Sequence, residues 1–465
     1  MNLGSSGNSV RLVSEHAFGN GGLSARLFQL ENGLRVLLLR DPAAPVFAYQ
    51  TWFRVGSRHE RPGKTGIAHL FEHLMFNETE TLPPGEFDRQ FELQGGNTNA
   101  ATWVDWTYYQ DDLPASELEL AVRLESERMQ RLVVKERQVE TERGVVISER
   151  RLRVEDDVDG FMSEELFRLA YTQHPYHWPT IGWMRDIENI TLADAVAFYR
   201  TYYAPNNATV VLVGDIEEQR ALSLITSYYC GIPAQEIPAA DKVVEPAQTG
   251  ERRATYKKPV LTDKLLVGYK APAFTDPDHL LLDLLSDLLL GGASSPVYCD
   301  LVIEREIMSS IGGSVTPFRD PGLWELGGSL QRGHSAAEAL ALFDEHIERL
   351  RRDGPTADAV ERARARALTG FYGGLRTAHG KAASLGEYET TGGDYRMLFA
   401  VPEILRRVTA ADMQRVAQRY LSPDQRTVII AEPDGQHEFS DDDDDEDDDA
   451  DDAAETGRSE NREAK

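Results

Sequence analysis

Short apolar runs alternate with longer amphipathic stretches along this chain, a pattern typical of a protein that mixes strands and helices. Residues 27–39 hold two apolar runs around Asn32 and Gly33, and an Asn-Gly pair in that position predicts a tight hairpin. Residues 264–269 predict a strand, and residues 278–290 predict an apolar helix that ends at two glycines. We therefore expect an α+β fold of mostly antiparallel sheets covered by long helices.

One stretch of this pattern occurs twice, displaced by 218 residues without a gap, so that residue 191 corresponds to residue 409. Each copy has a Thr that can cap a helix, an Asp three residues later, an amphipathic helix, a turn marked by Pro and an apolar strand. The copies are residues 191–213 and 409–431. The ungapped register favours duplication, so we predict two homologous domains.

The segments outside the two predicted domains differ from them in composition. The stretch between the domains is rich in Pro, Ala and charge without apolar periodicity, as in a linker. Residues 441–465 contain 14 acidic and 3 basic residues, a block that repels itself and buries no apolar area. The predicted parts are a disordered N-terminus at 1–22, a first domain at 23–230, a linker at 231–255, a second domain at 256–435 and an acidic disordered tail at 436–465.

Composition narrows the class of protein. The formal net charge of −28 argues against nucleic-acid binding. No apolar run approaches the roughly 18 residues of a membrane-spanning helix, so we expect a soluble protein without a membrane span. The polar N-terminus shows no apolar segment of a signal peptide, which favours a cytoplasmic location and leaves the periplasm open. Only two cysteines occur, Cys230 and Cys299, so a zinc site would need His and carboxylate ligands.

The stretch from His69 to His73 has the spacing of a metal site. Residues four apart lie on the same face of a helix, so His69 and His73 can reach one ion. Glu72 lies at the edge of that face, where its carboxylate can act on a metal-bound water without being a ligand. The order H-x-x-E-H is the inverzincin signature. The alternative is two surface histidines, but Ile67 and Leu70 indicate a helix that faces the core.

A catalytic zinc usually has three protein ligands, so a third one is needed. Residues 135–155 are strongly helical in composition, and Glu142 and Glu149 lie seven apart, two turns along one face. Either carboxylate can reach the ion, with the other supporting it. The same stretch also reads as a solvated charged helix, and the spacing alone does not choose between these interpretations.

These motifs together resemble those of the M16 family of zinc metallopeptidases (the pitrilysin and insulinase superfamily), and the processing-peptidase type is closest in size. The resemblance covers roughly residues 25–435. It rests on three motifs: Gly56-Ser57-Arg58-His59-Glu60, the stretch from Gly63 to His73, and the stretch from Glu142 to Glu149. The resemblance implies Zn²⁺ held by His69, His73 and Glu149 in the first domain, with Glu142 as the supporting glutamate.

The stretch from Gly95 to Thr102 resembles the family's edge strand, which pairs with an extended peptide. The resemblance implies that Asn99 and Ala100 hold the substrate backbone. An open sheet edge offers unpaired N–H and C=O groups that accept a peptide by strand addition. The alternative is a Gly-Asn turn that leads into an ordinary strand.

The chain departs from the family in its second half. Members carry an Arg, followed seven residues later by a Tyr, that together hold the substrate carbonyl. Arg305 matches the Arg, but Gly312 stands at the position of the Tyr. Loss of one oxyanion donor costs about 3–4 kcal/mol in comparable sites. We therefore expect a dimer, in which a second, non-identical subunit of the same type supplies the Arg/Tyr pair.

The sequence thus predicts a zinc metalloendopeptidase that cleaves extended or unfolded peptides, with Glu72 as the general base. This chain would be the zinc-bearing subunit of a two-chain enzyme. Two alternatives stay open: a non-catalytic structural subunit of the same family, and a protein that binds peptides without cutting them.

Overall fold

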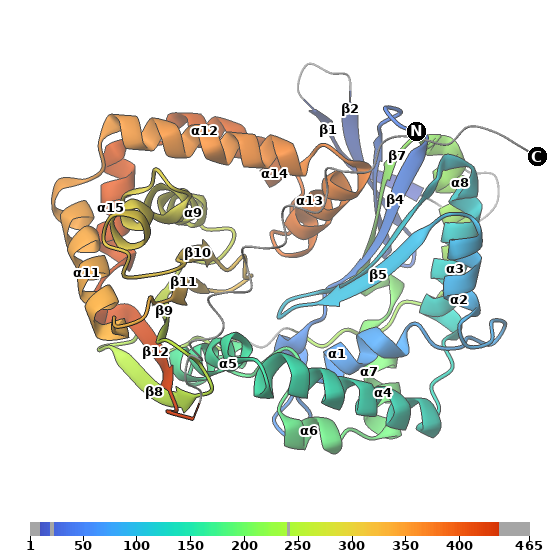
Figure 1. Ribbon diagram of the computed structural model, residues 1–465. Coiled ribbons are helices and arrows are strands. Elements are labelled where there is room, and N and C mark those ends of the chain that lie inside the picture. The colour runs from blue at the N-terminus through green and yellow to red at the C-terminus, as the bar shows by residue number, and fades with distance from the viewer. Residues whose placement is uncertain (1–9, 19–22, 240–241, 437–465) are drawn as a thin grey trace, which may run out of the picture.

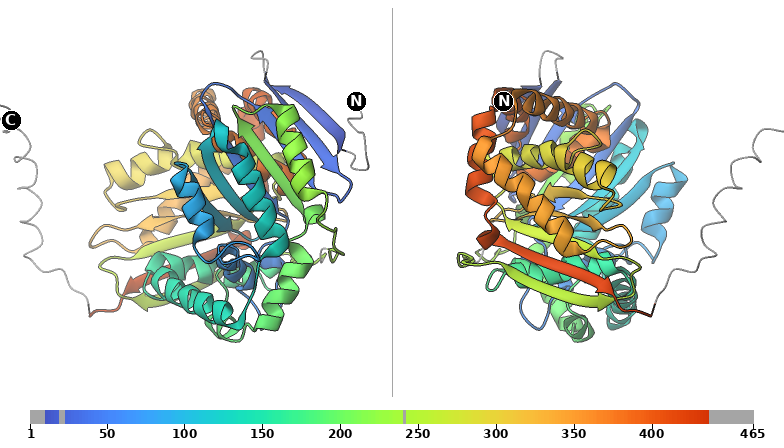
Figure 2. Two further views of the ribbon diagram at one scale, coloured as in Figure 1. Left: turned by 90° about the vertical axis from the view of Figure 1, so that its right-hand side faces the viewer. Right: turned by 60° about the vertical axis from the view of Figure 1, so that its left-hand side comes forward.

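The computed structural model describes residues 10–18, 23–239 and 242–436 (Figure 1). Two halves lie side by side, and each is built on one twisted sheet with helices packed against it. The turned views show helices in front of the sheet in each half (Figure 2). The predicted α+β architecture is confirmed.

The first half contains a sheet of seven strands in the order β1-β2-β3-β7-β4-β6-β5. All neighbours are antiparallel except β3 and β7, which run parallel. The predicted hairpin joins β2 to β3, and Gly33 takes a φ of 89° in its turn, a conformation that favours glycine. The strands are β1 (Val10–Phe18), β2 (Leu23–Leu30), β3 (Arg35–Arg40), β4 (Val46–Phe53), β5 (Asn97–Thr102), β6 (Thr107–Pro114) and β7 (Ala208–Gly214).

The second half repeats five of these strands in its own sheet, in the order β8-β12-β9-β11-β10. This order matches β3-β7-β4-β6-β5, and the parallel pair β8/β12 takes the place of β3/β7. The edge strand β10 is therefore the counterpart of β5. The strands are β8 (Arg252–Lys258), β9 (Lys264–Lys270), β10 (Gly312–Val315), β11 (Leu323–Ser329) and β12 (Arg426–Pro433).

The helices of the two halves follow the same duplication. The predicted caps are present: the Asp194 N–H donates to Thr191 Oγ1 at 3.3 Å, and the Asp412 N–H donates to Thr409 Oγ1 at 3.2 Å. The helices of the first half are α1 (Ile67–Leu74), α2 (Glu86–Leu93), α3 (Leu118–Arg131), α4 (Glu136–Arg150), α5 (Val158–Ala170), α6 (Met184–Glu188), α7 (Leu192–Tyr202) and α8 (Glu218–Tyr229). Those of the second half are α9 (Pro277–Leu290), α10 (Pro296–Tyr298), α11 (Ala336–Asp353), α12 (Ala357–Gly374), α13 (Ala378–Thr390), α14 (Met397–Arg407) and α15 (Ala410–Tyr420).

Each sheet is covered on one face by helices of its own half and on the other face by a helix of the opposite half. Leu166 of α5 packs with Ile429 on the second sheet, and Leu385 of α13 packs with Trp52 on the first sheet. A Cβ at Gly386 would lie 2.1 Å from Trp52 Nε1, so glycine permits this close approach of α13. Because both faces are buried, the central strands β7 and β12 carry continuous apolar runs, residues 210–213 and 428–431, rather than an alternating pattern.

Two predicted boundaries are wrong. The N-terminus was expected to be disordered over 1–22, but Val10–Phe18 forms β1 at the sheet edge, where main-chain pairing with β2 holds it. The linker was expected at 231–255, but β8 begins at Arg252, whose side chain donates to carbonyls at the end of α5. Strand pairing decides both boundaries, with the next strand β2 for β1 and with the distant β12 for β8, and local composition does not report it. The other residues of 1–22, and the tail beyond residue 436, lie outside the described residues.

Among the described residues, no helix is long and apolar enough to cross a membrane.

Candidate metal centre

The helix α1 begins at a tight, buried turn. Gly66 caps it with a φ of 88°, and a Cβ there would lie 2.5 Å from a backbone carbonyl oxygen. The buried Glu60 carboxylate accepts hydrogen bonds from the N–H groups of Gly66 and Ala68, at 2.9 and 2.8 Å, and thereby satisfies the helix start. Ile67, Leu70, Phe71 and Leu74 are buried in the core of the first half. With that face fixed, His69, Glu72 and His73 lie on the rest of the helix.

The helix α4 packs against α1 and brings two carboxylates to the histidines. Val139 and Val146 anchor α4 in the core, while Glu142 and Glu149 are half-buried. The Oε2 atom of Glu149 lies 3.5 Å from Nε2 of His69 and 3.5 Å from Nε2 of His73. One ligand atom from each of these three residues lies within 4.8 Å of the other two.

These three side chains fit a zinc ion. Zn–N and Zn–O bonds of about 2.0–2.2 Å at a tetrahedral angle place ligand atoms about 3.3–3.6 Å apart, as observed for both pairs with Glu149. The buried Oε2 atom of Glu149 has no hydrogen-bond partner although it lies between two imidazoles. A buried carboxylate oxygen in this position is suited to bind a cation. Two imidazoles and one carboxylate are also a donor set found in catalytic zinc sites.

The pKa values of the two imidazoles are shifted in opposite directions. Burial lowers the pKa of His69 to about 4, so its imidazole is neutral and able to bind a metal at neutral pH. Burial also disfavours the charged form of His73, but the Glu142 and Glu149 carboxylates outweigh it and raise its pKa to about 9. The same His73 contact holds the pKa of Glu149 below its usual value. The two acidic neighbours therefore attract positive charge to this position.

Glu142 supports His73 from outside the group of three. Its Oε2 atom lies 3.6 Å from Nδ1 of His73, and its Oε1 atom accepts a hydrogen bond from Asn77 Nδ2 at 3.1 Å. These two neighbours hold the pKa of Glu142 below its usual value. A carboxylate beside the distal imidazole nitrogen fixes ring orientation and raises ligand basicity in zinc sites. The spacing of α4 could not separate Glu142 from Glu149, whereas the structure gives them different places.

Glu72 lies beside the same group and is tied to the edge strand. Its Oε2 atom accepts a hydrogen bond from the hydroxyl of Thr102, the last residue of β5, at 2.5 Å. Burial raises the pKa of Glu72 above its usual value. A carboxylate with a raised pKa next to a metal site is suited to proton transfer near neutral pH.

The strand β5 is the free edge of the first sheet, because it pairs with β6 on one side only. Asn99 is exposed on this strand, and its Oδ1 atom accepts a hydrogen bond from the N–H of Ala100 at 2.9 Å. Since β5 also packs against α1, the open edge and the metal ligands meet at the same end of the first half. The predicted edge strand is therefore present where the site requires it.

Arg305 does not lie with His69, His73 and Glu149. Its guanidinium donates to Asp300 at 2.7 Å, and the same carboxylate contacts His346 of α11 at 2.8 Å. Figure 1 shows α11 on the side of the second half that faces away from α1. Gly312 begins β10 and is exposed. A role for Arg305 in substrate binding stays a prediction.

Several residues support the metal centre in roles that the sequence did not predict. Thr102 holds Glu72, Asn77 holds Glu142, and Glu60 caps α1. A further contact joins Arg153 Nε to Glu149 Oε1 at 3.1 Å. Only the last one has a local signal, an Arg four residues after a Glu on a helix. The Thr102 and Asn77 contacts depend on how separate segments meet, and the Glu60 contacts depend on the shape of the turn before α1; spacing along the chain shows neither.

Comparison with known families agrees with this geometry. Residues 35–182 match the family described as "Insulinase (Peptidase family M16)", and residues 189–367 match "Peptidase M16 inactive domain". The chain belongs to the M16 peptidase family, as the sequence motifs had indicated. The helices α1 and α4 and the strand β5 fall within the first match, and α9 with the strands β8 to β11 of the second sheet falls within the second.

Individual relatives support the same assignment. The zinc protease PqqE of Helicobacter pylori is 32% identical over 411 residues, which cover 87% of this chain and 92% of the relative. An uncharacterized zinc protease of Mycobacterium leprae is 25% identical over 395 residues, covering 84% of this chain and 88% of the relative. Zn²⁺ is accordingly the cofactor of this chain.

Solved structures share the fold over most of the chain. A protease from Helicobacter pylori superposes with a TM-score of 0.85 at 31% identity, covering 88% of this chain and 99% of that one. A putative M16-like peptidase from Alicyclobacillus acidocaldarius gives a TM-score of 0.80 at 25% identity, covering 88% and 98%. The two-sheet architecture is thus that of M16 peptidases.

Proposed function

We propose that this chain is a zinc-dependent endopeptidase that cleaves extended or unfolded peptides. The observation that carries the proposal is the meeting of His69, His73 and Glu149 with Glu72 at the open edge of β5. The relatives named as zinc proteases support hydrolysis of peptides as the general reaction.

His69, His73 and Glu149 would hold the zinc ion, and Glu142 would orient His73. When bound, the ion acts as a Lewis acid that polarises the scissile carbonyl and a water molecule. Glu72 takes the proton from the attacking water and then delivers it to the leaving amine. The hydroxyl of Thr102 keeps the Glu72 carboxylate directed toward this reaction.

The substrate would bind to β5 as an added strand. The free edge offers main-chain N–H and C=O groups, which bind an extended peptide with little regard to its side chains. Asn99 and Ala100 lie on this edge, and the hydrogen bond between them would open as the peptide pairs. Folded proteins cannot present such a strand, so extended or unfolded segments are the expected substrates.

The active form would be a dimer with a second, non-identical M16-like subunit. The support is the Gly312 at the position of the family's Tyr, together with the Asp300 ion pair that occupies Arg305. A partner chain would supply the Arg/Tyr pair that binds the developing oxyanion.

A second candidate is a non-catalytic subunit that binds peptides or has a structural role. Gly312 favours it, because one oxyanion donor is absent from this chain. The presence of both histidines, Glu149 and Glu72 in one group favours the enzyme, because binding alone needs no general base.

The experiment that tests the proposal compares the wild type with Glu72→Gln on a quenched, extended peptide, with zinc per chain measured in both. We expect Glu72→Gln to keep its zinc and to lose at least about 100-fold in turnover, as for removal of a general base. Unchanged turnover would refute the role of Glu72. The same assay with and without a co-purified companion chain separates a two-chain enzyme from a subunit that cannot cleave at all.

A further inference from the structure

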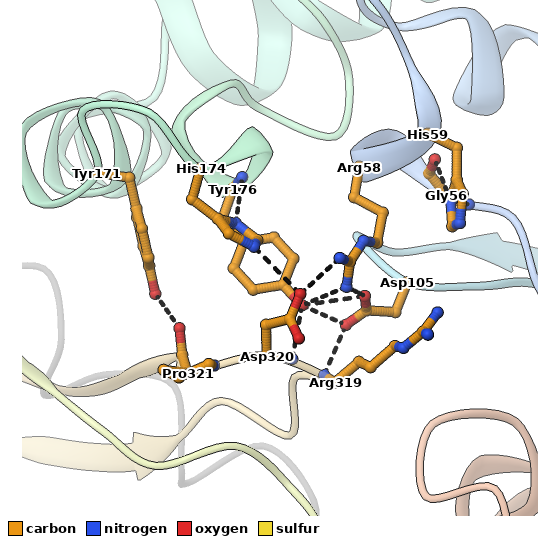
Figure 3. A network of polar contacts seen from close by, with 10 residues as sticks. All are labelled: Gly56, Arg58, His59, Asp105, Tyr171, His174, Tyr176, Arg319, Asp320 and Pro321. Carbon is orange, nitrogen blue, oxygen red and sulfur yellow. Dashed lines mark hydrogen bonds and ion pairs between the residues drawn. The ribbon is translucent and has the colours of Figure 1, made fainter. Parts of the chain in front are cut away.

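A network of polar contacts joins the two halves at the end of β5 (Figure 3). Asp320, in the loop between β10 and β11 of the second half, accepts a hydrogen bond from Arg58 Nη2 at 2.5 Å. Arg58 Nη1 donates to Asp105, in the turn between β5 and β6, at 2.8 Å. The Tyr176 hydroxyl and the backbone N–H of Arg319 also donate to Asp105, at 2.9 Å each. One guanidinium is therefore shared by a carboxylate from each half.

The centre of this network is buried, whereas the side chain of Asp320 is 35% exposed. The side chains of Arg58 and Asp105 are 6% and 3% exposed. Asp320 has a second contact with His174 Nε2 at 3.2 Å, and its backbone N–H donates to the Tyr176 hydroxyl at 3.1 Å. His174 and Arg58 hold the pKa of Asp320 to about 2, so its carboxylate is charged at neutral pH. A buried guanidinium that loses such a partner is strongly disfavoured in its place.

The network leads directly to the proposed general base. The N–H groups of Ser57 and Arg58 donate to two carbonyls of the turn between β5 and β6, at 3.1 and 3.0 Å. A Cβ at Gly56 would lie 2.3 Å from a carbonyl oxygen of this turn, so the turn packs closely on this segment. Thr102 comes immediately before the turn and donates to Glu72. A displacement of Arg58 therefore moves the turn, and with it the hydroxyl that directs Glu72.

We propose that Asp320 of the second half is a positioning residue for the reaction at the metal centre of the first half. Through Arg58 and Asp105 it fixes the turn between β5 and β6, and through Thr102 it fixes the orientation of Glu72. The second half thus takes part in catalysis although it contributes no metal ligand. The inference rests on the proposed function, since it assigns Glu72 the role of general base.

Another ion pair between the halves provides a matched control. Lys381 of α13 contacts Asp41, which follows β3, at 2.9 Å, and the two side chains are 10% and 15% exposed. Both pairs join the halves through an aspartate. However, three strands separate β3 from β5, which ends at Thr102, so Asp41 lies away from the site in this sheet. Asp320→Asn and Asp41→Asn therefore each remove one carboxylate charge from an ion pair between the halves, at different distances from the site.

The test measures kcat and KM of zinc-loaded, full-length variants on the quenched peptide, together with zinc content and Tm. We expect Asp320→Asn to lower kcat by about tenfold or more with KM nearly unchanged, since small misplacements of a reacting group have effects of this size. Asp41→Asn should lower Tm by a similar amount and change kcat less than about twofold. A kcat of Asp320→Asn equal to that of Asp41→Asn, or a change confined to KM, would overturn the inference.

A double-mutant cycle tests the proposed route. Thr102→Val removes the hydroxyl and should lower kcat by itself. If Asp320 acts through Thr102, the combined variant falls little further than the more impaired single variant. If the losses in kcat of the two single variants multiply in the combined variant, Asp320 does not act through Thr102. Should Asp320→Asn fail to fold, Asp320→Glu keeps the charge while displacing Arg58, and the same cycle applies to it.

Measuring the turnover of Glu72→Gln in the same assay shows whether a negative result concerns the proposed function or only this inference. If Glu72→Gln retains turnover, the proposed function falls and the inference with it. If Glu72→Gln loses turnover while Asp320→Asn behaves as the wild type, only the inference falls.

Discussion

The two halves of this protein share one architecture but differ in chemistry. In the first half, α1 packs against the edge strand β5 and the long helix α4; in the second half, α9 packs against the edge strand β10 and the long helix α12. The acidic residues Asp283 and Asp287 of α9 have the same four-residue spacing as His69 and His73 of α1. A cavity of about 580 Å³ opens between α9 and α12. The same arrangement of a helix, an edge strand and a long helix is thus present in both halves.

The two halves differ in the charged side chains that these helices carry. In the first half, Oε2 of Glu149 on α4 faces two imidazoles and has no hydrogen-bond partner, although Arg153 contacts Oε1 of the same carboxylate. In the second half, Arg366 of α12 donates to the Asp287 carboxylate at 3.1 Å and to its backbone carbonyl at 2.7 Å. There a guanidinium, rather than a pair of imidazoles, lies beside the carboxylate. This comparison teaches that the fold provides the position, whereas the side chains decide whether a metal is required.

The largest expected contrast comes from single substitutions at corresponding places. His69→Ala should lose its zinc and lower turnover by at least about 100-fold, because both polarisation of the carbonyl and activation of water depend on the ion. Asp283→Ala should keep both zinc content and turnover at the wild-type level. Metal analysis and peptide hydrolysis on the same samples check this. Full zinc retention in His69→Ala would disprove the ligand assignment.

A second prediction concerns the helices that each half contributes to the other. Leu166→Ala in α5 and Leu385→Ala in α13 each remove a buried side chain, 0% and 1% exposed, from the contact with the opposite sheet. Each should cost about 2–5 kcal/mol in the free energy of unfolding. Because the packing is reciprocal, we expect one shared transition in calorimetry for both variants. Two separate transitions, with only one of them shifted, would show that the halves unfold independently.

The smallest effect is expected for the ion pair between Arg366 and Asp287, which takes the place of a metal ion in the second half. The Arg366 and Asp287 side chains are 32% and 29% exposed, so their pair contributes only about 0–1 kcal/mol. Asp287→Asn should therefore change Tm little and leave zinc content unaltered, as thermal unfolding and metal analysis will show. A loss of zinc in this variant would mean that the second half also binds metal.

Part of the site could be predicted because it depends on local periodicity. The five residues from His69 to His73 specify a helix face with two imidazoles, and the repeat displaced by 218 residues predicts the second half. The choice of Glu149 over Glu142 could not come from spacing, since both lie on the same face of α4. It depends on how α4 packs against α1, and the family resemblance supplied it in advance.

The rest of the molecule depends on contacts between distant segments. The strand β1 has a polar, glycine-rich neighbourhood, so only its pairing with β2 identifies it as a strand. The exchange of α5 and α13 between the halves leaves no periodic signal, because an apolar helix face does not show which sheet it covers. The contact between Arg58 and Asp320 joins residues 262 positions apart, and nothing near either residue predicts the other.

The central claim is that the first half alone holds the catalytic zinc. Crystals of the zinc-loaded protein, measured above and below the zinc absorption edge, test it most directly through the anomalous difference map. We expect one strong peak per chain, between His69, His73 and Glu149, and none between α9 and α12. A map without that peak, or one with a peak of equal height beside Asp283 and Asp287, would contradict it.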